Sequence, residues 1–224
     1  MSDKEQRRRA KHRRILDAAL AEFARNGFSG ASMQGIATRA GVSKPTLYQY
    51  FGQKQALLVA VLDAGKSELL APFENAHGRP MVAVLWEFAW TYAAFVLRPD
   101  MLSLARLIIG EAGRLPDLAR DYQRAGPLKA LAGIAAYLET QEQAGAVTFQ
   151  DAELAAQNLW ALILSAPREH LLHNPDQSPD QKALKRHITN GLEVFLKAYS
   201  TRVTLDIAAL ADIASKDKRG DLHG

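Results

Sequence analysis

Hydrophobic residues recur every three to four positions along almost the whole chain, and no stretch of alternating apolar and polar residues stands out. This is the spacing of one face of an α-helix. Five apolar residues of positions 9–26 share such a stripe: Ile15, Leu16, Ala19, Leu20 and Phe23. Gly27 follows where a helix would end. The pattern predicts an all-α fold.

Two short helices are predicted after this first one, over 33–40 and from Ser43 to about Phe51. Ser32 and Ser43 are suitable N-caps, because a serine oxygen accepts a hydrogen bond from a free N–H of the first turn. Gly41 allows the positive φ of a sharp bend. Pro45 falls in the first turn, where its missing N–H removes no bond.

Longer helices are predicted for the rest of the chain. Their expected ranges are 53 to about 70 (before Pro72), 81–97, 100–112, 115–144 with a bend near Gly126, 151–173, 179–199 and 203–215. The stretch 81–97 is apolar nearly all round, but it is shorter than the ~20 residues of a membrane span and contains Glu87. We therefore expect a central helix of a globular domain and no membrane segment.

The two short helices and their glycine bend have the form of a helix-turn-helix, whose second helix enters the DNA major groove. Ala37 is small where the helices would cross, and Leu47 would anchor the second helix inward. The opposite face of that helix carries donors and flat rings: Lys44, Thr46, Tyr48, Gln49 and Tyr50. Alternatively, the two tyrosines pack on neighbouring helices.

Charge is distributed unevenly along the chain. The net charge is +4, but residues 1–54 contain 11 lysines and arginines against 4 acidic residues. Such a basic end indicates a polyanionic partner, with double-stranded DNA the first candidate and an anionic membrane the second. The basic arm, Lys4–Arg9 and Lys11–Arg14, would follow phosphates or reach the minor groove, or else form a solvated tail.

The run SMQGIATRAGVSKPTLYQYFGQKQALLVAVL resembles the N-terminal domain of the TetR family of bacterial transcriptional regulators, with SKPTLYQYF its most specific part. The resemblance implies a three-helix, homeodomain-like DNA-binding domain joined to a larger helical domain that dimerises and binds a small molecule. It implies base or groove contacts for Gln34, Lys44, Pro45, Thr46 and Gln49. It implies phosphate contacts for Ser32, Tyr48, Tyr50 and Lys54.

The resemblance suggests a division into a basic arm and helix-turn-helix domain at 1–62, an effector-binding and dimerisation domain at 63–215, and a flexible tail at 216–224. In the family the last two major helices pair with those of a second subunit. The faces that suit this pairing are mainly apolar and consist of Leu154, Ala155, Asn158, Leu159, Leu162, Ile163, Ala166, Ile188, Leu192, Val194, Phe195 and Tyr199. The same residues could instead form an intramolecular core.

A small apolar or aromatic effector is expected in the larger domain, because pockets are lined mainly by apolar and aromatic side chains. The candidate lining is Phe73, Trp86, Trp90, Tyr92, Phe95 and Met101. Large rings at helical spacing are also typical of an ordinary core.

Other chemistry is weakly supported. With no cysteine, the chain has no disulfide or thiolate metal site, which fits the reducing cytoplasm. No signal peptide precedes the basic start. Gly65-Lys66-Ser67 resembles the end of a phosphate-binding loop but lacks its first glycine. His170 and His173 could share a metal only with a third ligand that is not evident. We expect no enzyme, cofactor or metal.

The favoured reading is a homodimeric repressor that binds a palindromic operator and is released by a small apolar effector. The alternative is a ligand-independent DNA-binding regulator controlled by a protein partner, which would lack a pocket. A third reading, an all-α enzyme with an incidental helix-turn-helix, would require a polar catalytic cluster that the sequence does not display.

Overall fold

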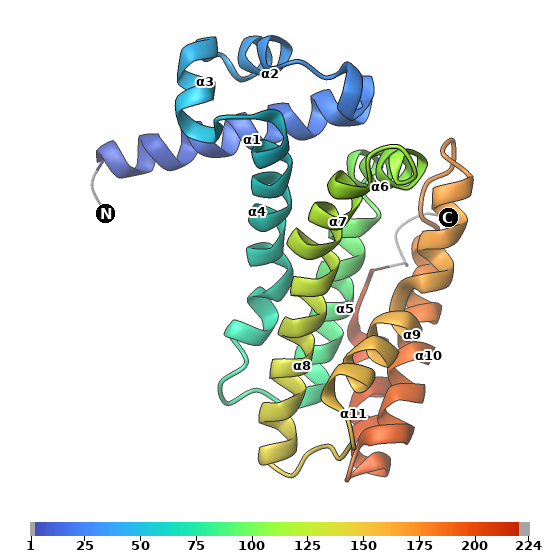
Figure 1. The fold of residues 1–224 in the computed structure, drawn as a ribbon. Helices are drawn as coiled ribbons and strands as arrows, with labels where there is room; N and C mark the ends of the chain where they lie inside the picture. The colour runs from blue at the N-terminus through green and yellow to red at the C-terminus, as the bar shows by residue number, and fades with distance from the viewer. Residues whose placement is uncertain (1–2, 220–224) are drawn as a thin grey trace. The chain divides into compact units, whose positions relative to one another are not determined.

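A computed structural model describes residues 3–219, whose regular secondary structure is α-helical, with no strand (Figure 1). The helices are α1 (Asp3–Gly30), α2 (Met33–Ala40), α3 (Lys44–Phe51), α4 (Lys54–Glu74), α5 (Met81–Val96), α6 (Pro99–Glu111), α7 (Pro116–Ala125), α8 (Pro127–Gln143), α9 (Ala152–His173), α10 (Gln181–Tyr199) and α11 (Val203–Lys216). The all-α prediction is confirmed.

The chain forms two compact units. The first contains the residues up to Gly65 together with Arg98–Pro127, and the second contains Lys66–Leu97 together with the residues from Leu128 onward. Helix α4 contributes to both. Helices α6 and α7 thus group with the helix-turn-helix by contact, whereas the functional division at residue 62 stays a prediction.

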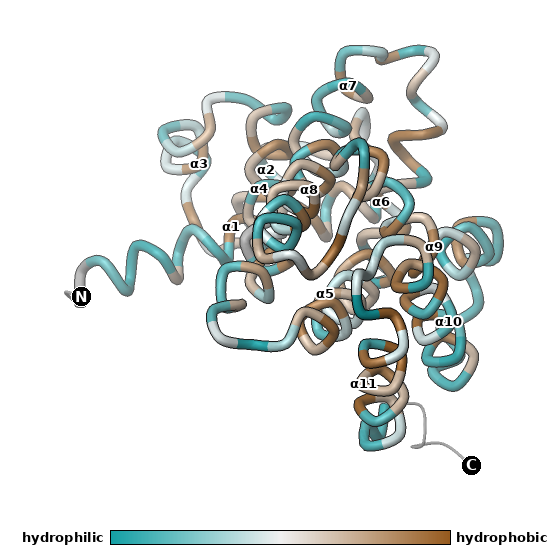
Figure 2. Tube along the Cα trace, turned by 90° about the horizontal axis from the view of Figure 1, so that it is seen from below, coloured by the Kyte–Doolittle hydropathy of each residue, from teal (hydrophilic) through white to brown (hydrophobic). Residues whose placement is uncertain are grey.

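Helix α1 is interrupted at Gly27, which has φ 72° and ψ 167°. A side chain there would be strained, and a Cβ would also lie 3.0 Å from Leu107 of α6. At its other end α1 continues to Asp3 rather than starting at Arg9. The basic arm is therefore the exposed, hydrophilic beginning of α1 (Figure 2), although the side chain of Lys4 lies outside the described residues.

The predicted caps of α2 and α3 are confirmed. The Ser32 hydroxyl accepts from the Gly35 N–H at 2.9 Å, and the Ser43 hydroxyl accepts from the Thr46 N–H at 3.3 Å. Gly41 has φ 64°, the left-handed conformation expected of the bend. The caps and the bend fix where each short helix begins and ends, so the outward face of α3 is set locally.

The second unit is built around α5, ten of whose residues are buried. Helices α9, α10 and α11 belong to the same unit, and α5 contacts all three. Helix α10 crosses α9 closely at Gly191, where a Cβ would overlap the backbone of Leu162. An apolar helix covered in this way matches the central helix predicted for 81–97.

Prolines and glycines place some helix ends differently from expectation. Helix α4 continues two residues past Pro72 to Glu74, since a proline this near a C-terminus removes only one late hydrogen bond. The helix expected over 115–144 is two helices, because Gly126 ends α7 and Pro127 starts α8. Of the tail expected over 216–224, Lys216 ends α11, and Asp217 and Arg219 are held by side-chain contacts. Residues 220–224 lie outside the described residues.

Candidate nucleic-acid interface and effector site

An open depression of about 410 Å³ lies along α3, between the N-terminal ends of α2 and α4. Five of the predicted DNA-contacting residues line it: Ser32, Gln34, Lys44, Tyr48 and Lys54. Two helix N-termini here present N–H groups and partial positive charge, which suits a phosphate. The depression therefore combines polar side chains and helix ends of the kind that contact a nucleic-acid backbone.

The other four predicted residues, Pro45, Thr46, Gln49 and Tyr50, follow along α3. All except half-buried Thr46 are exposed, while Leu47 on the inner face is fully buried. The Thr46 hydroxyl lies 2.7 Å from that of Ser43. Helix α3 thus has one anchored face and one outward polar face.

The two tyrosines of α3 remain accessible, with Tyr48 44% and Tyr50 38% exposed. The Lys44 ammonium lies 6.0 Å from the centre of the Tyr48 ring. Tyr50 lies beside α1, 6.3 Å from the His12 ring and 5.9 Å from the Lys11 ammonium. Tyr50 therefore packs partly on a neighbouring helix, whereas Tyr48 contacts a residue of its own helix.

Lys54 is turned toward the end of α1. Its ammonium donates to the carbonyls of Phe28, Ser29 (3.4 Å) and Ala31 (2.8 Å), and burial lowers its pKa. These three bonds join the start of α4 to the last turn of α1. A phosphate contact by Lys54, as the resemblance implies, would have to be made in addition to these bonds or in place of them.

Sequence reasoning did not identify the polar groups that support the helix-turn-helix. Glu22 of α1 is 7% exposed, accepts from the Asn26 side chain at 2.9 Å and lies 3.9 Å from Arg39. It fits because Gly35 of α2 lacks a Cβ, which would overlap the carboxylate. Arg14 donates to the Ala40 carbonyl at 3.1 Å and so caps α2. Of these contacts, only the one between Glu22 and Asn26 could have been expected from the sequence, because residues four apart lie on the same face of a helix.

In the second unit, five aromatic rings follow one another from α8 to α9. Phe73 of α4 stacks on Tyr137 at 4.4 Å and on Phe88 at 4.5 Å. Phe88 stacks on Tyr92 at 5.9 Å, and Tyr92 meets Trp160 edge-on at 5.6 Å. The series joins α4, α5, α8 and α9 in one aromatic core.

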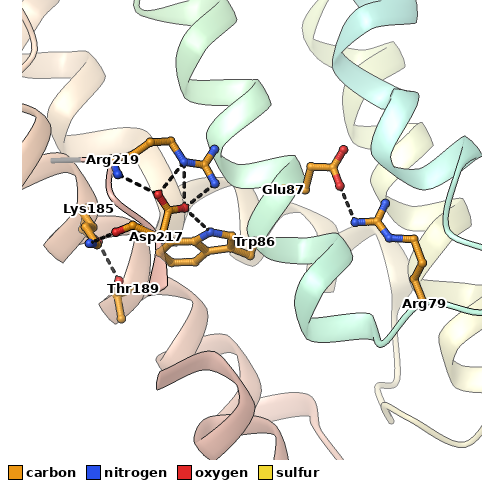
Figure 3. Close-up of polar contacts among 7 residues, drawn as sticks. All are labelled: Arg79, Trp86, Glu87, Lys185, Thr189, Asp217 and Arg219. Atoms are coloured by element: carbon orange, nitrogen blue, oxygen red, sulfur yellow. Dashed lines mark hydrogen bonds and ion pairs between the residues drawn. The ribbon is translucent and has the colours of Figure 1, made fainter. Parts of the chain in front are cut away.

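A cavity of about 590 Å³ that is widely open to solvent lies at the Tyr137 end of this series, between the end of α4 and α8. Its lining is Leu70, Phe73, Glu74, Ala76, His77, Gly78, Arg79, Gly133, Ala136, Tyr137, Thr140 and Gln141. Burial raises the pKa of Tyr137 to about 12, against the opposing charge of Arg79, so the phenol stays protonated. Arg79 also pairs with Glu87 of α5 (Figure 3). The cavity has the size and apolar character of a small-molecule site.

Of the predicted effector residues, Phe73 lines this cavity and the others do not. Trp86, Trp90 and Tyr92 are buried and Phe95 is half-buried, while Met101 is a buried residue of α6 in the first unit. Tyr137, Gly133 and the polar rim were missed because α4 and α8 are about 60 residues apart, and no local pattern indicates that they meet.

The two tryptophans of α5 are covered by the end of the chain. The Trp86 indole N–H donates to Asp217 at 2.8 Å (Figure 3). The Arg219 guanidinium lies 4.7 Å from the centre of the Trp90 ring. The two rings are 6.0 Å apart and inclined by 67°. Their burial thus depends on residues far along the sequence.

Some of the residues expected to suit dimerisation are buried within this chain, and others are exposed on its surface. Inside the chain are Ala155, Leu159, Ile163, Ile188, Leu192 and Phe195, all buried. Outside are Leu154, Asn158, Ala166 and Val194, all exposed, and Leu162 and Tyr199 are half-buried. Helices α9 and α10 therefore have both an internal apolar face and an outer one with exposed leucine and valine.

The weaker chemical signals find little support in the described part of the chain. Gly65-Lys66-Ser67 lies within helical α4, although the side chains of Lys66 and Ser67 are outside the description. His170 faces Gln177 at 2.8 Å, and His173 faces the Glu169 carbonyl at 2.9 Å. Over residues 3–219 no three metal-binding side chains gather, and no helix is both long and apolar enough to cross a membrane.

Two protein-family models match different parts of the chain. Residues 15–61 match the family of bacterial regulatory proteins called the tetR family, and residues 83–201, just over half of the chain, match the C-terminal domain of AefR-like transcriptional repressors. The HTH-type transcriptional regulator RutR of Escherichia coli K12 is 46% identical over 65 residues, which are 29% of this chain and 31% of RutR. The chain thus spans about a third of the length of this curated relative.

Two solved structures extend the likeness over most of the chain. A TetR-family regulator from Mesorhizobium loti has a TM-score of 0.70 and 29% identity, covering 90% of this chain and all of that one. The flavonoid-responsive regulator FrrA has a TM-score of 0.64 and 31% identity, covering 86% of this chain and 98% of its own. With the family models and the predicted helix-turn-helix in agreement, the chain belongs to the TetR family of bacterial transcriptional regulators.

Proposed function

We propose that this protein is a transcriptional repressor that binds a palindromic operator as a homodimer. The observation that carries the proposal is α3, whose outward residues Lys44, Gln49 and Tyr48 are exposed beside the N-terminus of α2. One such helix reads only a few base pairs, so specificity requires two, about one DNA turn (~34 Å) or a multiple of it apart. The outer face of α9 and α10, with Leu154 and Val194, is the proposed dimer contact.

We propose further that a small planar aromatic effector enters the cavity between α4 and α8 and relieves repression. Phe73 and Tyr137 line the cavity with aromatic edges and apolar surface, and the Tyr137 hydroxyl stays protonated and able to donate a hydrogen bond. Arg79 and His77 lie at the same cavity and suit hydroxyl or carboxylate groups. A phenolic effector is also in keeping with the flavonoid response of FrrA.

The proposed coupling passes through α4, which contributes residues to both compact units. An effector that touches Leu70 and Phe73 of α4 and Gly133 of α8 would favour one position of α4 over another. A ligand shifts such an equilibrium only by its difference in affinity for the two states, and a tenfold loss of operator affinity needs about 1.4 kcal/mol. The cavity favours this function over control by a protein partner.

The test begins with selection of bound fragments from random DNA, which identifies the operator. Operator affinity is then measured by fluorescence anisotropy with and without a panel of hydroxylated flavones. We expect at least one flavone to lower the affinity of the natural protein and to act more weakly on Gly133→Leu, whose Cβ would overlap the Leu70 side chain and so force the cavity wall to rearrange. A monomer on a single half-site would refute the dimer.

The matched control is Gly110→Leu, placed on α6 where a Cβ would meet nothing within 4 Å. This variant should respond to the flavone as the natural protein does. Equal responses of Gly133→Leu and the natural protein would show that the effector does not bind in this cavity. A flavone that binds without changing operator affinity would favour the partner-controlled regulator.

A further inference from the structure

The last described residues of the chain form a strap over α5. We call Asp217–Arg219 the C-terminal strap. Asp217 contacts Trp86, and Lys185 of α10 donates to the Asp217 carbonyl (Figure 3). Arg219 lies over the Trp90 ring. All of these residues belong to the second unit. None of them lines the effector cavity at Phe73 and Tyr137. The strap is therefore a separate feature that the proposed function does not use.

Asp217 is a half-buried residue whose carboxylate accepts from several donors. Its side chain is only 9% exposed, and it accepts from the Trp86 indole at 2.8 Å and from the Arg219 backbone N–H at 2.8 Å. The Arg219 guanidinium adds further bonds, from Nε at 2.8 and 2.9 Å and from Nη2. Burial alone would raise the pKa of this carboxyl, but these hydrogen bonds and the Arg219 charge lower it to about 2. The negative charge is thus present at neutral pH and is matched by a cation.

That cation, the Arg219 guanidinium, lies on the surface over a buried ring, as a bound ligand would, and is not part of the core. The Arg219 side chain is 49% exposed, whereas the Trp90 ring beneath it is buried. A planar cation over an indole face and beside a carboxylate makes two favourable contacts at once, one with the ring and one with the charge. The Trp90 indole N–H is also buried without a hydrogen-bond partner among the described residues, so Trp90 is packed here through its ring and not through a hydrogen bond.

We propose that Trp90, Asp217 and Trp86 form a binding site for a planar organic cation, an amidinium or guanidinium, and that Arg219 occupies this site from within the chain. Arg219 is the second residue after Asp217, and a short tether of this kind gives it a local concentration of the order of mM or more. A free cation must therefore displace Arg219. A ligand whose cation is attached to an aromatic ring competes better than guanidinium itself, because it covers more of Trp90.

The test uses benzamidine, a planar aromatic amidinium, titrated into the full-length protein by calorimetry without DNA. Arg219→Gln removes the internal cation and should bind benzamidine at least tenfold more tightly than the natural protein. Lys218→Gln, an exposed neighbour with the same change of charge, should bind as the natural protein does. Adding Asp217→Asn to Arg219→Gln should abolish the gain, since the amide keeps an acceptor for Trp86 but loses the charge.

A second measurement keeps the strap intact. The Nε–H resonance of Arg219 in the natural protein is followed by NMR as benzamidine is added, and displacement should move it to the position of a solvated arginine. Affinity of Arg219→Gln within twofold of Lys218→Gln, together with an unmoved Arg219 resonance, would overturn the proposal. A gain that survives Asp217→Asn would overturn it as well. No operator is involved, so these outcomes are independent of repression.

Discussion

Helices α3 and α5 both carry several aromatic residues, but they use them in opposite ways. In α3 only Leu47 is buried, and Tyr48 and Tyr50 remain accessible on a helix of eight residues. In α5 Trp86, Trp90 and Tyr92 are covered, although the same residues looked like a pocket lining. Aromatic content alone thus does not indicate a binding surface. What distinguishes the two helices is whether segments far along the chain return to cover them.

The largest effect that would test this contrast is expected at Phe88, which is 1% exposed between Phe73 and Tyr92. Phe88→Ala should lower the free energy of unfolding by about 3–5 kcal/mol, through lost burial and a cavity in the ring series. Urea unfolding followed by tryptophan fluorescence measures it, because all three tryptophans lie in the second unit.

Phe88→Leu is the matched control, since it keeps most of the buried apolar surface and should lose clearly less stability. A loss below about 1.5 kcal/mol for the alanine variant would mean that the aromatic residues of α5 are not a packed core. The contrast with α3 would then fail.

On α3 the expected effects concern DNA and not stability. Lys44→Ala should cost about 1–3 kcal/mol of operator binding and relax preference at one base pair, if Lys44 reads a base edge. Tyr48→Phe removes a hydroxyl proposed to bind phosphate, so all operator variants should weaken similarly. Unfolding free energy should change by less than about 0.5 kcal/mol for either exposed residue.

Anisotropy titrations over a set of single-base operator variants separate the two roles. If both substitutions weakened every variant by the same factor, the assignment of base contact to Lys44 and phosphate contact to Tyr48 would be wrong.

A smaller effect is expected for the cap of α3. Ser43→Ala removes the acceptor of the Thr46 N–H and the partner of the Thr46 hydroxyl, and should destabilise the first unit by ~1 kcal/mol. Circular dichroism during urea unfolding detects this change, since the first unit has no tryptophan. Ser215→Ala, at an exposed serine that bonds only to the Asp212 carbonyl, should be nearly neutral. Equal losses for the two serines would argue against a capping role.

A further prediction concerns how acid changes the contribution of Asp217, in the strap, to stability. The pKa of Asp217 is lowered to about 2 from the ordinary 3.8, so its carboxylate stabilises the folded state above the ordinary value and loses that contribution as pH falls toward 2. The difference in Tm between the natural protein and Asp217→Asn should be constant above about pH 5 and shrink below pH 4. Thermal melts at a series of pH values measure it. A difference that instead grew with acidity would contradict the lowered pKa.

The helix-turn-helix could be predicted from the sequence because its determinants are local. Ser32, Gly41, Ser43 and Pro45 each act within a few residues, through a cap, a left-handed bend or a first-turn proline. These local features also determine which face of α3 is exposed. The DNA contacts assigned to its residues stay predictions, and for Lys54 the bonds to α1 were not foreseeable, because they join residues 23–26 positions apart.

The second unit shows why the remainder could not be predicted. Trp86 and Asp217 are separated by 131 residues, and their hydrogen bond leaves no mark on the spacing of either segment. The effector cavity likewise depends on Gly133, whose missing Cβ lets α8 approach Leu70 of α4. A single glycine in a helical stretch gives no sign of which helix it faces. Helical periodicity identified the elements of this unit, but not the contacts between them.

The paired indoles of α5 also give the protein an optical property. At 6.0 Å and an angle of 67°, the electronic transitions of Trp86 and Trp90 are close enough to couple, and coupled chromophores in a fixed chiral arrangement produce a bisignate band in circular dichroism. The sign and amplitude of that band depend on how the two rings are held relative to each other. One ring is held by a hydrogen bond to Asp217 and the other lies under Arg219. The far-ultraviolet spectrum therefore contains an intrinsic, label-free signal that changes when this end of the chain is released.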